Sequence, residues 1–191
     1  MPYRKGPAMC EPASQGGGAP PALPPNCQLE TLGVAFFDLS PIPQWTSSEA
    51  DARVASFFVE FYRLAAEHLE PAGARIVKLM GDAGLATFAK ESAEDAIFAL
   101  CDFASVARRA ARDAGLDTYL AVNVHVGPVV AGDFGPPGAE RYDVVGKTVN
   151  VAARLGRRGI TLSPQAFRCL SPEGRERFQK ITRPIVYQLR D

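Results

Sequence analysis

Hydrophobic and polar positions follow two different periods along the chain from residue 30 onward. Residues 32–38 form a short, nearly continuous apolar run, which predicts a buried central strand. Apolar side chains then recur at helical spacing over 54–69, behind a helix-start pattern at 47–49. We therefore expect a helix over about 48–70, ended by the Pro-Ala-Gly sequence at 71–73.

The next elements follow from the same two periods. Residues 75–80 and 85–89 are short runs around a Gly-Asp-Ala-Gly turn, which predicts a β-hairpin. Residues 92–114 form a second amphipathic helix closed by Gly115, and residues 119–126 a fourth strand. The resulting order, βαββαβ, is typical of a ferredoxin-like α+β fold, in which both helices cover one face of an antiparallel sheet.

A C-terminal βαβαβ extension is expected beyond a Gly-rich stretch that ends at Gly138. Its predicted strands and helices are, in chain order, 141–145 (strand), 148–155 (helix), 160–162 (strand), 164–170 (helix) and 184–189 (strand). We expect the last strand to close the sheet.

The first 28 residues differ in composition from the rest. They hold seven of the 16 prolines and a run of three glycines, with few large apolar side chains. Such a segment cannot bury enough surface to offset the entropy lost on ordering. We expect a disordered tail over 1–28 and a working domain over 29–191.

Charge and composition exclude several classes of protein. With 21 Lys and Arg against 21 Asp and Glu, the formal net charge is zero, so no basic surface for nucleic acid is indicated. There is no apolar run of the roughly 18 to 20 residues that a membrane helix needs, and no signal-peptide pattern. The four cysteines form no C-x-x-C pair, so neither a zinc site nor a redox motif is indicated. We expect a cytoplasmic protein without a membrane segment.

Two carboxylates lie at neighbouring points of the predicted sheet. Asp38 ends the first strand, and Asp82 lies in the hairpin turn. If they converge, they could hold divalent cations such as Mg²⁺. Taken singly, each is better explained without a metal, Asp82 as an ordinary turn residue and Asp38 as a solvated strand end.

Three further polar residues stand among apolar neighbours. Lys78 either extends its ammonium to the sheet edge or points at a ligand. Asn150 and Arg154 are four residues apart, so they share one helical face and could present an amide and a guanidinium to a phosphate. The alternative for this pair is a capping amide and an arginine bonded to a carboxylate.

Four sequence motifs occur in a fixed order. They are F-x-D at 36–38, K-x-x-G-D at 78–82, H-x-G-x-V-x-x-G at 125–132 and Y-D-V-x-G-x-x-V-N-x-A-x-R at 142–154. In this order, over about 34–163, the chain resembles the catalytic domain of class III nucleotidyl cyclases, the adenylyl and guanylyl cyclases. Four ordered motifs are far more specific than a single Gly-rich loop.

The resemblance implies a head-to-tail homodimer with two composite active sites. Asp38 and Asp82 of one subunit would hold two Mg²⁺ or Mn²⁺ ions. The other subunit would supply Lys78, Asp143, Asn150 and Arg154. Asn150 would position the ribose, and Arg154 would stabilise the charge on the α-phosphate as the 3′-hydroxyl attacks it. Lys180 loosely matches a family lysine that contacts the triphosphate.

The base preference follows from donors and acceptors. Adenine presents an acceptor at N1 and a donor at C6, which the ammonium of Lys78 and the carboxylate of Asp143 complement. Guanine inverts both groups and would leave unpaired polar atoms that cost roughly 1 to 3 kcal/mol each. We expect conversion of ATP to 3′,5′-cyclic AMP and pyrophosphate.

The chain departs from the family pattern after Asp38. Pro41 stands where the family has glycine, and neither Pro41 nor Pro43 offers an N–H to the triphosphate. An alternative is therefore a catalytically weak or inactive cyclase-like module that binds nucleotide or a partner. A diguanylate cyclase would share the βαββαβ core, but its G-G-D-E-F turn is absent.

Overall fold

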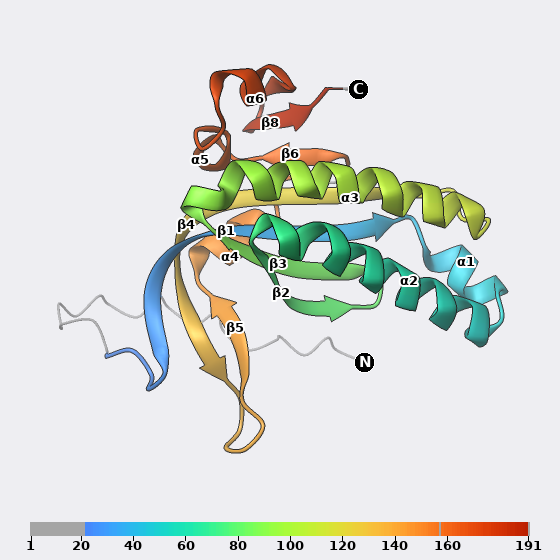
Figure 1. The fold of residues 1–191 in the computed structure, drawn as a ribbon, viewed down its shortest axis with the longest axis horizontal. Helices are drawn as coiled ribbons and strands as arrows, with labels where there is room; N and C mark the ends of the chain where they lie inside the picture. The colour runs from blue at the N-terminus through green and yellow to red at the C-terminus, as the bar shows by residue number, and fades with distance from the viewer. Residues whose placement is uncertain (1–21, 157, 191) are drawn as a thin grey trace, which may run out of the picture.

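One mixed sheet organises the fold, in the strand order β2-β3-β1-β4-β6-β8-β7 with β5 paired to β4 (Figure 1). The computed structural model describes residues 22–156 and 158–190, so residues 1–21 of the predicted tail lie outside the described residues. The strands are β1 (Cys27–Ser40), β2 (Ala74–Met80), β3 (Ala83–Ala89), β4 (Tyr119–Phe134), β5 (Arg141–Val145), β6 (Ile160–Leu162), β7 (Phe178–Thr182) and β8 (Ile185–Leu189). The helices are α1 (Pro43–Ser48), α2 (Asp51–Leu69), α3 (Ala93–Asp113), α4 (Lys147–Ala152), α5 (Pro164–Phe167) and α6 (Pro172–Glu176), with 3₁₀ turns at Glu70–Ala72 and Lys90–Ser92.

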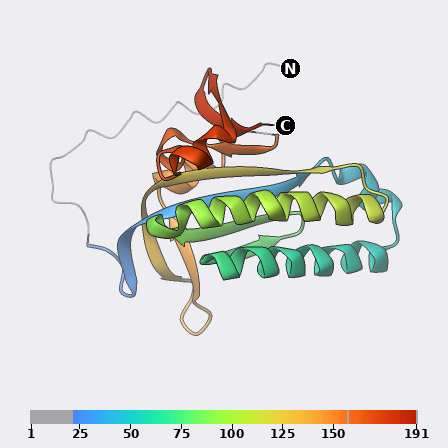
Figure 2. The ribbon, with the colours of Figure 1, turned by 45° about the horizontal axis from the view of Figure 1, so that its top comes forward.

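Helices α2 and α3 lie side by side on one face of the sheet, as Figure 2 shows. Alternation along β1 builds this layer, because Phe37 and its i±2 neighbours point to the helices. The ring of Phe37 meets Phe103 of α3 edge-on, with 5.4 Å between ring centroids. On the neighbouring strand only glycine fits beneath Phe37, since a Cβ at Gly84 would lie 2.1 Å from that ring. The ferredoxin-like α+β arrangement predicted from the element order is confirmed.

The opposite face of the sheet carries a smaller apolar cluster under α4. It consists of Val34, Leu85, Val129, Ala131, Val144 and Ala152. Because α4 has only six residues, its position depends on this packing rather than on helix propensity. None of the described helices is both long and apolar enough to span a membrane.

Several element bounds differ from the sequence-based expectations. β1 begins at Cys27, so the predicted domain boundary at residue 28 falls inside a strand, and β4 continues through the Gly-rich stretch to Phe134. The two strands pair along their whole shared length, from Cys27↔Gly132 to Ser40↔Tyr119, and this pairing outweighs the weak strand propensity of glycine.

The expected helix over 48–70 is two helices, α1 and α2, because α1 begins at Pro43 and the chain turns extended at Glu49 before α2. Strand β7 and helix α6 were not predicted. Both are five residues long, and β7 forms by pairing with β8.

Candidate active site

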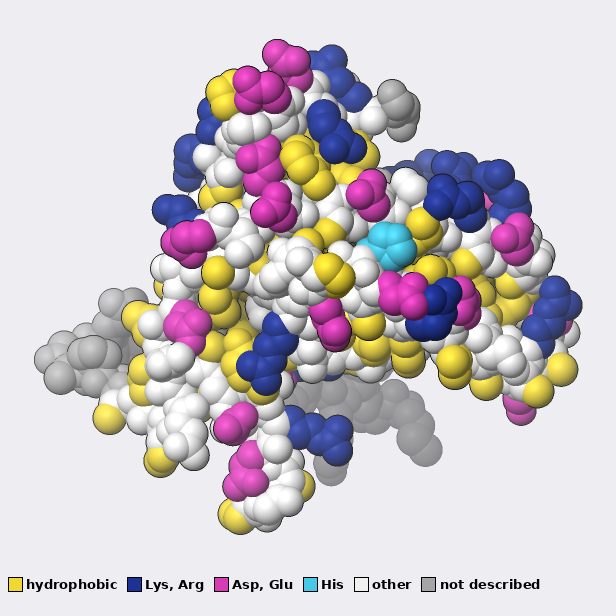
Figure 3. Space-filling view, viewed as in Figure 1, with side chains coloured by type: hydrophobic (Ala, Val, Ile, Leu, Met, Phe, Trp, Pro, Cys, Tyr) yellow, Lys and Arg dark blue, Asp and Glu magenta, His cyan; other side chains and the backbone are white. Residues whose placement is uncertain are grey.

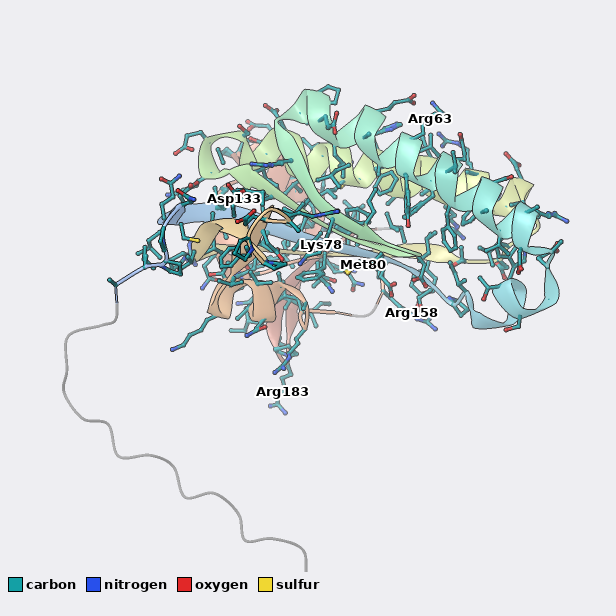
Figure 4. All side chains as sticks on the ribbon, turned by 90° about the horizontal axis from the view of Figure 1, so that it is seen from below. Arg63, Lys78, Met80, Asp133, Arg158 and Arg183 are labelled. Atoms are coloured by element: carbon teal, nitrogen blue, oxygen red, sulfur yellow. The ribbon has the colours of Figure 1, made fainter. Side chains whose placement is uncertain are left out.

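A hollow of about 690 Å³ opens on the sheet face opposite α2 and α3. Its floor includes Phe36 and Asp38 of β1 and Asn123 of β4, and its wall includes Gly156 and Arg158 from the segment between α4 and β6. Side chains alternate along a strand, so Asp38 shares this face with Phe36 rather than with the core residue Phe37. Figure 4 shows Lys78, Met80 and Arg158 on the side of the sheet away from α2.

The two predicted metal-binding carboxylates lie close together. Asp38 is paired in register with Ala83, the residue after Asp82, and the Leu39 amide donates to the Asp82 carbonyl at 3.0 Å. Burial raises the pKa of Asp38, and the negative charge of Asp82 raises that pKa further. Asp38 lines the hollow, the negative charge of Asp82 acts on it, and neither carboxylate forms an ion pair with a described residue.

This arrangement fits a divalent cation. A raised pKa at Asp38 means that the ionised carboxylate lacks compensation, and a cation shared with Asp82 would supply it. The described part of the chain holds no group of three or more His, Cys, Asp or Glu that could bind a metal. A pair of carboxylates is nonetheless a normal protein contribution to Mg²⁺, which takes its remaining ligands from water and substrate phosphates.

Lys78 and Asp143 form an ion pair, with 2.5 Å between Nζ and Oδ2. A β-bulge in β2 makes this contact possible. Ile76 pairs with Ala86 and Lys78 with Leu85, so two residues of β2 oppose one of β3 and Lys78 moves to the hollow's face of the sheet. Without the bulge, alternation would turn Lys78 toward the helices with Ile76.

Asp143 is oriented by its neighbours as well as by Lys78. Its second carboxylate oxygen, Oδ1, accepts a hydrogen bond from the Val144 amide at 2.8 Å. On the same two strands the guanidinium of Arg75 lies over the Tyr142 ring, 3.4 Å from the ring centroid. Strands β2 and β5 are therefore joined by two side-chain contacts, which hold Lys78 and Asp143 together.

Asn150 and Arg154 project from α4 and the turn that follows it. Helix α4 ends at Ala152, three residues earlier than predicted, but the Arg154 amide donates to the Val151 carbonyl at 3.1 Å, so the turn continues. Both side chains are exposed. Buried Thr148 fixes this helix, since its Oγ1 donates to the Pro128 carbonyl of β4 at 2.6 Å.

Lys180 lies apart from the other candidates within one chain. It is an exposed residue of β7, at the opposite edge of the sheet from β2. Strand β7 is four strands away from β1, or about 19 Å at the usual strand spacing. Its predicted contact with the triphosphate stays a prediction.

Asn123 is a site residue that sequence reasoning missed. It is 8% exposed, its Nδ2 donates to the Gly156 carbonyl at 3.0 Å, and its buried Oδ1 has no partner among the described residues. It therefore ties β4 to the segment that follows Arg154. The available signal was an amide on an otherwise apolar, alternating strand.

Residues 26–187 match the family model for the adenylate and guanylate cyclase catalytic domain. The chain belongs to this family. It is 32% identical over 126 residues to the uncharacterized protein Rv1319c of Mycobacterium tuberculosis and, at the same identity, to the uncharacterized protein Mb1353c of Mycobacterium bovis. Each alignment covers 64% of this chain but only 23% of the relative's length.

Solved structures with the same fold include cyclases of both substrate classes. A bacterial light-regulated adenylyl cyclase has a TM-score of 0.76 at 20% identity, covering 85% of this chain and 52% of that one. The guanylyl cyclase Cya2 has a TM-score of 0.74 at 16% identity, covering 86% of this chain and 93% of that one. The adenylyl cyclase CyaB from P. aeruginosa has a TM-score of 0.69 at 21% identity, covering 86% of this chain and 96% of that one. The predicted family is confirmed, whereas these neighbours do not decide between ATP and GTP.

Proposed function

We propose that this domain is an adenylate cyclase, which converts ATP to 3′,5′-cyclic AMP and pyrophosphate at the interface of a head-to-tail homodimer. The contact between Lys78 and Asp143 is the observation that carries the choice of base. An ammonium and a carboxylate held side by side match the N1 acceptor and the C6 amino donor of adenine. A guanine in the same position would place a donor against Lys78 and an acceptor against Asp143.

Asp38 and Asp82 would hold Mg²⁺ or Mn²⁺ in this proposal. When bound, the ions lower the pKa of the attacking 3′-hydroxyl and neutralise the triphosphate. The chain itself keeps the two carboxylates together near the end of an internal strand, where the β1–β3 register fixes Asp38 beside the hairpin turn. Such positioning is the main protein contribution to phosphoryl transfer.

Asn150 and Arg154 would act on the sugar and the α-phosphate. Their side chains are exposed, and no described residue is recorded as their hydrogen-bond or ion-pair partner. The Asn150 amide can hold the ribose in line for attack, and the Arg154 guanidinium can stabilise the negative charge that builds on the α-phosphate. Lys180 would reach the β- and γ-phosphates, and its edge position suits a contact from a second subunit.

Exposed apolar side chains support the homodimer. Met80 on β2, Val145 on β5 and Val151 on α4 are 50%, 43% and 41% exposed. Met80 is two residues from Lys78, and Val151 follows Asn150, so exposed apolar side chains lie beside polar candidates, a mixture that protein–protein interfaces also have.

The direct test is turnover of ATP and GTP by the purified domain in Mg²⁺ and in Mn²⁺. We expect cyclic AMP from ATP and at least a tenfold lower rate with GTP. Asp82→Ala should abolish product, whereas Asp133→Ala, which alters an exposed carboxylate of β4, should not. A folded dimer that forms no product would favour the alternative, a cyclase-like module that signals by binding. Preferential production of cyclic GMP would refute the assignment of the base.

A further inference from the structure

A second hollow, of about 440 Å³, lies between α3 and the C-terminal strands. Three arginines from separate elements line it: Arg108 on α3, Arg158 before β6, and Arg190 after β8. No described aspartate or glutamate lines this hollow. Figure 3 shows Lys and Arg side chains on both sides of the notch between the C-terminal part and the body of the molecule.

The positive charges of these arginines are not neutralised by the described residues. None of the recorded ion pairs includes Arg108, Arg158 or Arg190. The guanidinium of Arg158 lies 5.6 Å from the centroid of the Tyr119 ring, a contact that orients the group without removing its charge. Three exposed like charges around one hollow make its electrostatic potential positive, which favours an anion there.

The rest of the lining adds hydrogen-bond donors above an apolar floor. Gln179 of β7 and Gln188 of β8 carry amides, and the Gln188 Nε2 donates to the Arg158 carbonyl at 3.0 Å, which ties the arginine's backbone to the sheet. The floor is apolar, formed by Leu120, Ile160 and Leu189. Arginine forks match the geometry of phosphate oxygens, and several forks together suit an anion with more than one charge.

We propose that this hollow, which we call the arginine hollow, is a binding site for a small oligophosphate anion. It is separate from the proposed catalytic residues, because none of them lines it. Arg158 and Tyr119 line both this hollow and the catalytic one, so the two sites share one wall. The inference does not depend on the proposed cyclase activity.

The test is a calorimetric titration of the purified domain with sodium tripolyphosphate, in EDTA and without ATP. Arg108→Gln and Arg190→Gln alter residues that line only the arginine hollow. Each should weaken binding roughly tenfold, since each removes charge-assisted hydrogen bonds. Arg109→Gln is the matched control, because it removes an equal charge from an exposed neighbouring position of α3 that does not line the hollow. Binding should also weaken as NaCl rises.

The proposal would be overturned if the wild-type chain gave no heat of binding, or if Arg108→Gln and Arg190→Gln both kept the wild-type affinity. It would also be overturned if Arg109→Gln lost as much affinity as these variants, because that would indicate unspecific charge attraction. Circular dichroism of each variant checks that it is folded. Since no substrate or metal is present, an inactive cyclase would still give a clear result.

Discussion

At the scale of single residues, the alternation of side chains along a strand separates the polar candidate residues from the core. Asp38 lies between Phe37 and Leu39, both buried, yet its carboxylate faces the hollow on the other side of the sheet. The same alternation places Asn123 on the hollow's floor between two buried valines. A polar residue on a mostly buried strand can thus reach a site without entering the core.

Asp143→Asn should reduce the selectivity for ATP over GTP. The amide keeps the size of the side chain but adds donors, so it can pair with the O6 of guanine and no longer holds Lys78 by charge. We expect kcat/KM for ATP to fall about tenfold and the ATP-to-GTP ratio to narrow. Asp133→Asn makes the same change on the adjoining strand β4 and should leave both quantities unaltered. A constant ratio in Asp143→Asn would mean that this carboxylate does not read the base.

His125 should make stability depend on pH. Its Nδ1 lies 2.8 Å from the Ser163 Oγ, and burial lowers the pKa of His125. The unfolded chain therefore binds a proton at His125 more readily than the folded chain does. Protonation then lowers the free energy of unfolding as the pH falls below about 6.5, the ordinary pKa of histidine, and has no such effect at higher pH. Urea unfolding at pH 7.5 and 5.5 should show a smaller loss of stability in His125→Gln than in the wild type.

At the scale of elements, two local features orient the candidate residues. The bulge in β2 reverses the direction of Lys78, and the Thr148 hydrogen bond anchors α4 to β4. Neither β2 nor α4 is long, so small shifts in pairing or packing would move the functional groups. The precision of the site thus depends on features of one or two residues.

Thr148→Val tests how much the Thr148 hydrogen bond, as distinct from apolar packing, contributes to the position of α4. Valine has nearly the same shape, but it leaves the Pro128 carbonyl without its 2.6 Å donor. We expect the free energy of unfolding to fall by about 1 kcal/mol, together with a drop in kcat as α4 and Asn150 shift. Thr31→Val, at an exposed position of β1, is the control and should alter neither. Urea melts and steady-state kinetics give both measurements, and an unchanged kcat would show that the bond is not needed to position α4.

At the scale of the whole molecule, one chain presents two sets of candidate groups. Asp38 lines the hollow with Asp82 in the adjoining hairpin turn, whereas Asn150 and Arg154 are exposed and have no side-chain partner among the described residues. The exposed apolar side chains on β2, β5 and α4 suit association with a second copy.

Mixing two inactive variants tests whether the sites are shared. Lys78→Ala and Asp82→Ala should each lack activity alone, because each would break both sites of its homodimer. An equal mixture should recover about one quarter of the wild-type rate, since half of the dimers are mixed and each of these has one intact site of two. Recovery is measured as cyclic AMP formed after subunit exchange, which tagged chains can verify. Exchange without recovery would contradict the composite site.

Local sequence patterns determined the two long helices and the family. The apolar stripes of α2 and α3 and the four ordered motifs identified the βαββαβ core and the cyclase resemblance, since these signals depend only on neighbouring residues. Strands β5 and β6 were also predicted at their observed bounds.

Tertiary structure alone decided the features that need a partner far along the chain. The full lengths of β1 and β4 and the strand β7 depend on pairing, and the bulge at Lys78 depends on register with β3. The proximity of Lys78 to Asp143, 65 residues away, and the gathering of three arginines around one hollow follow from the assembled sheet and its packing. A linear pattern carries residue types and local period, whereas distances between distant segments appear only when strand pairing and packing bring them together.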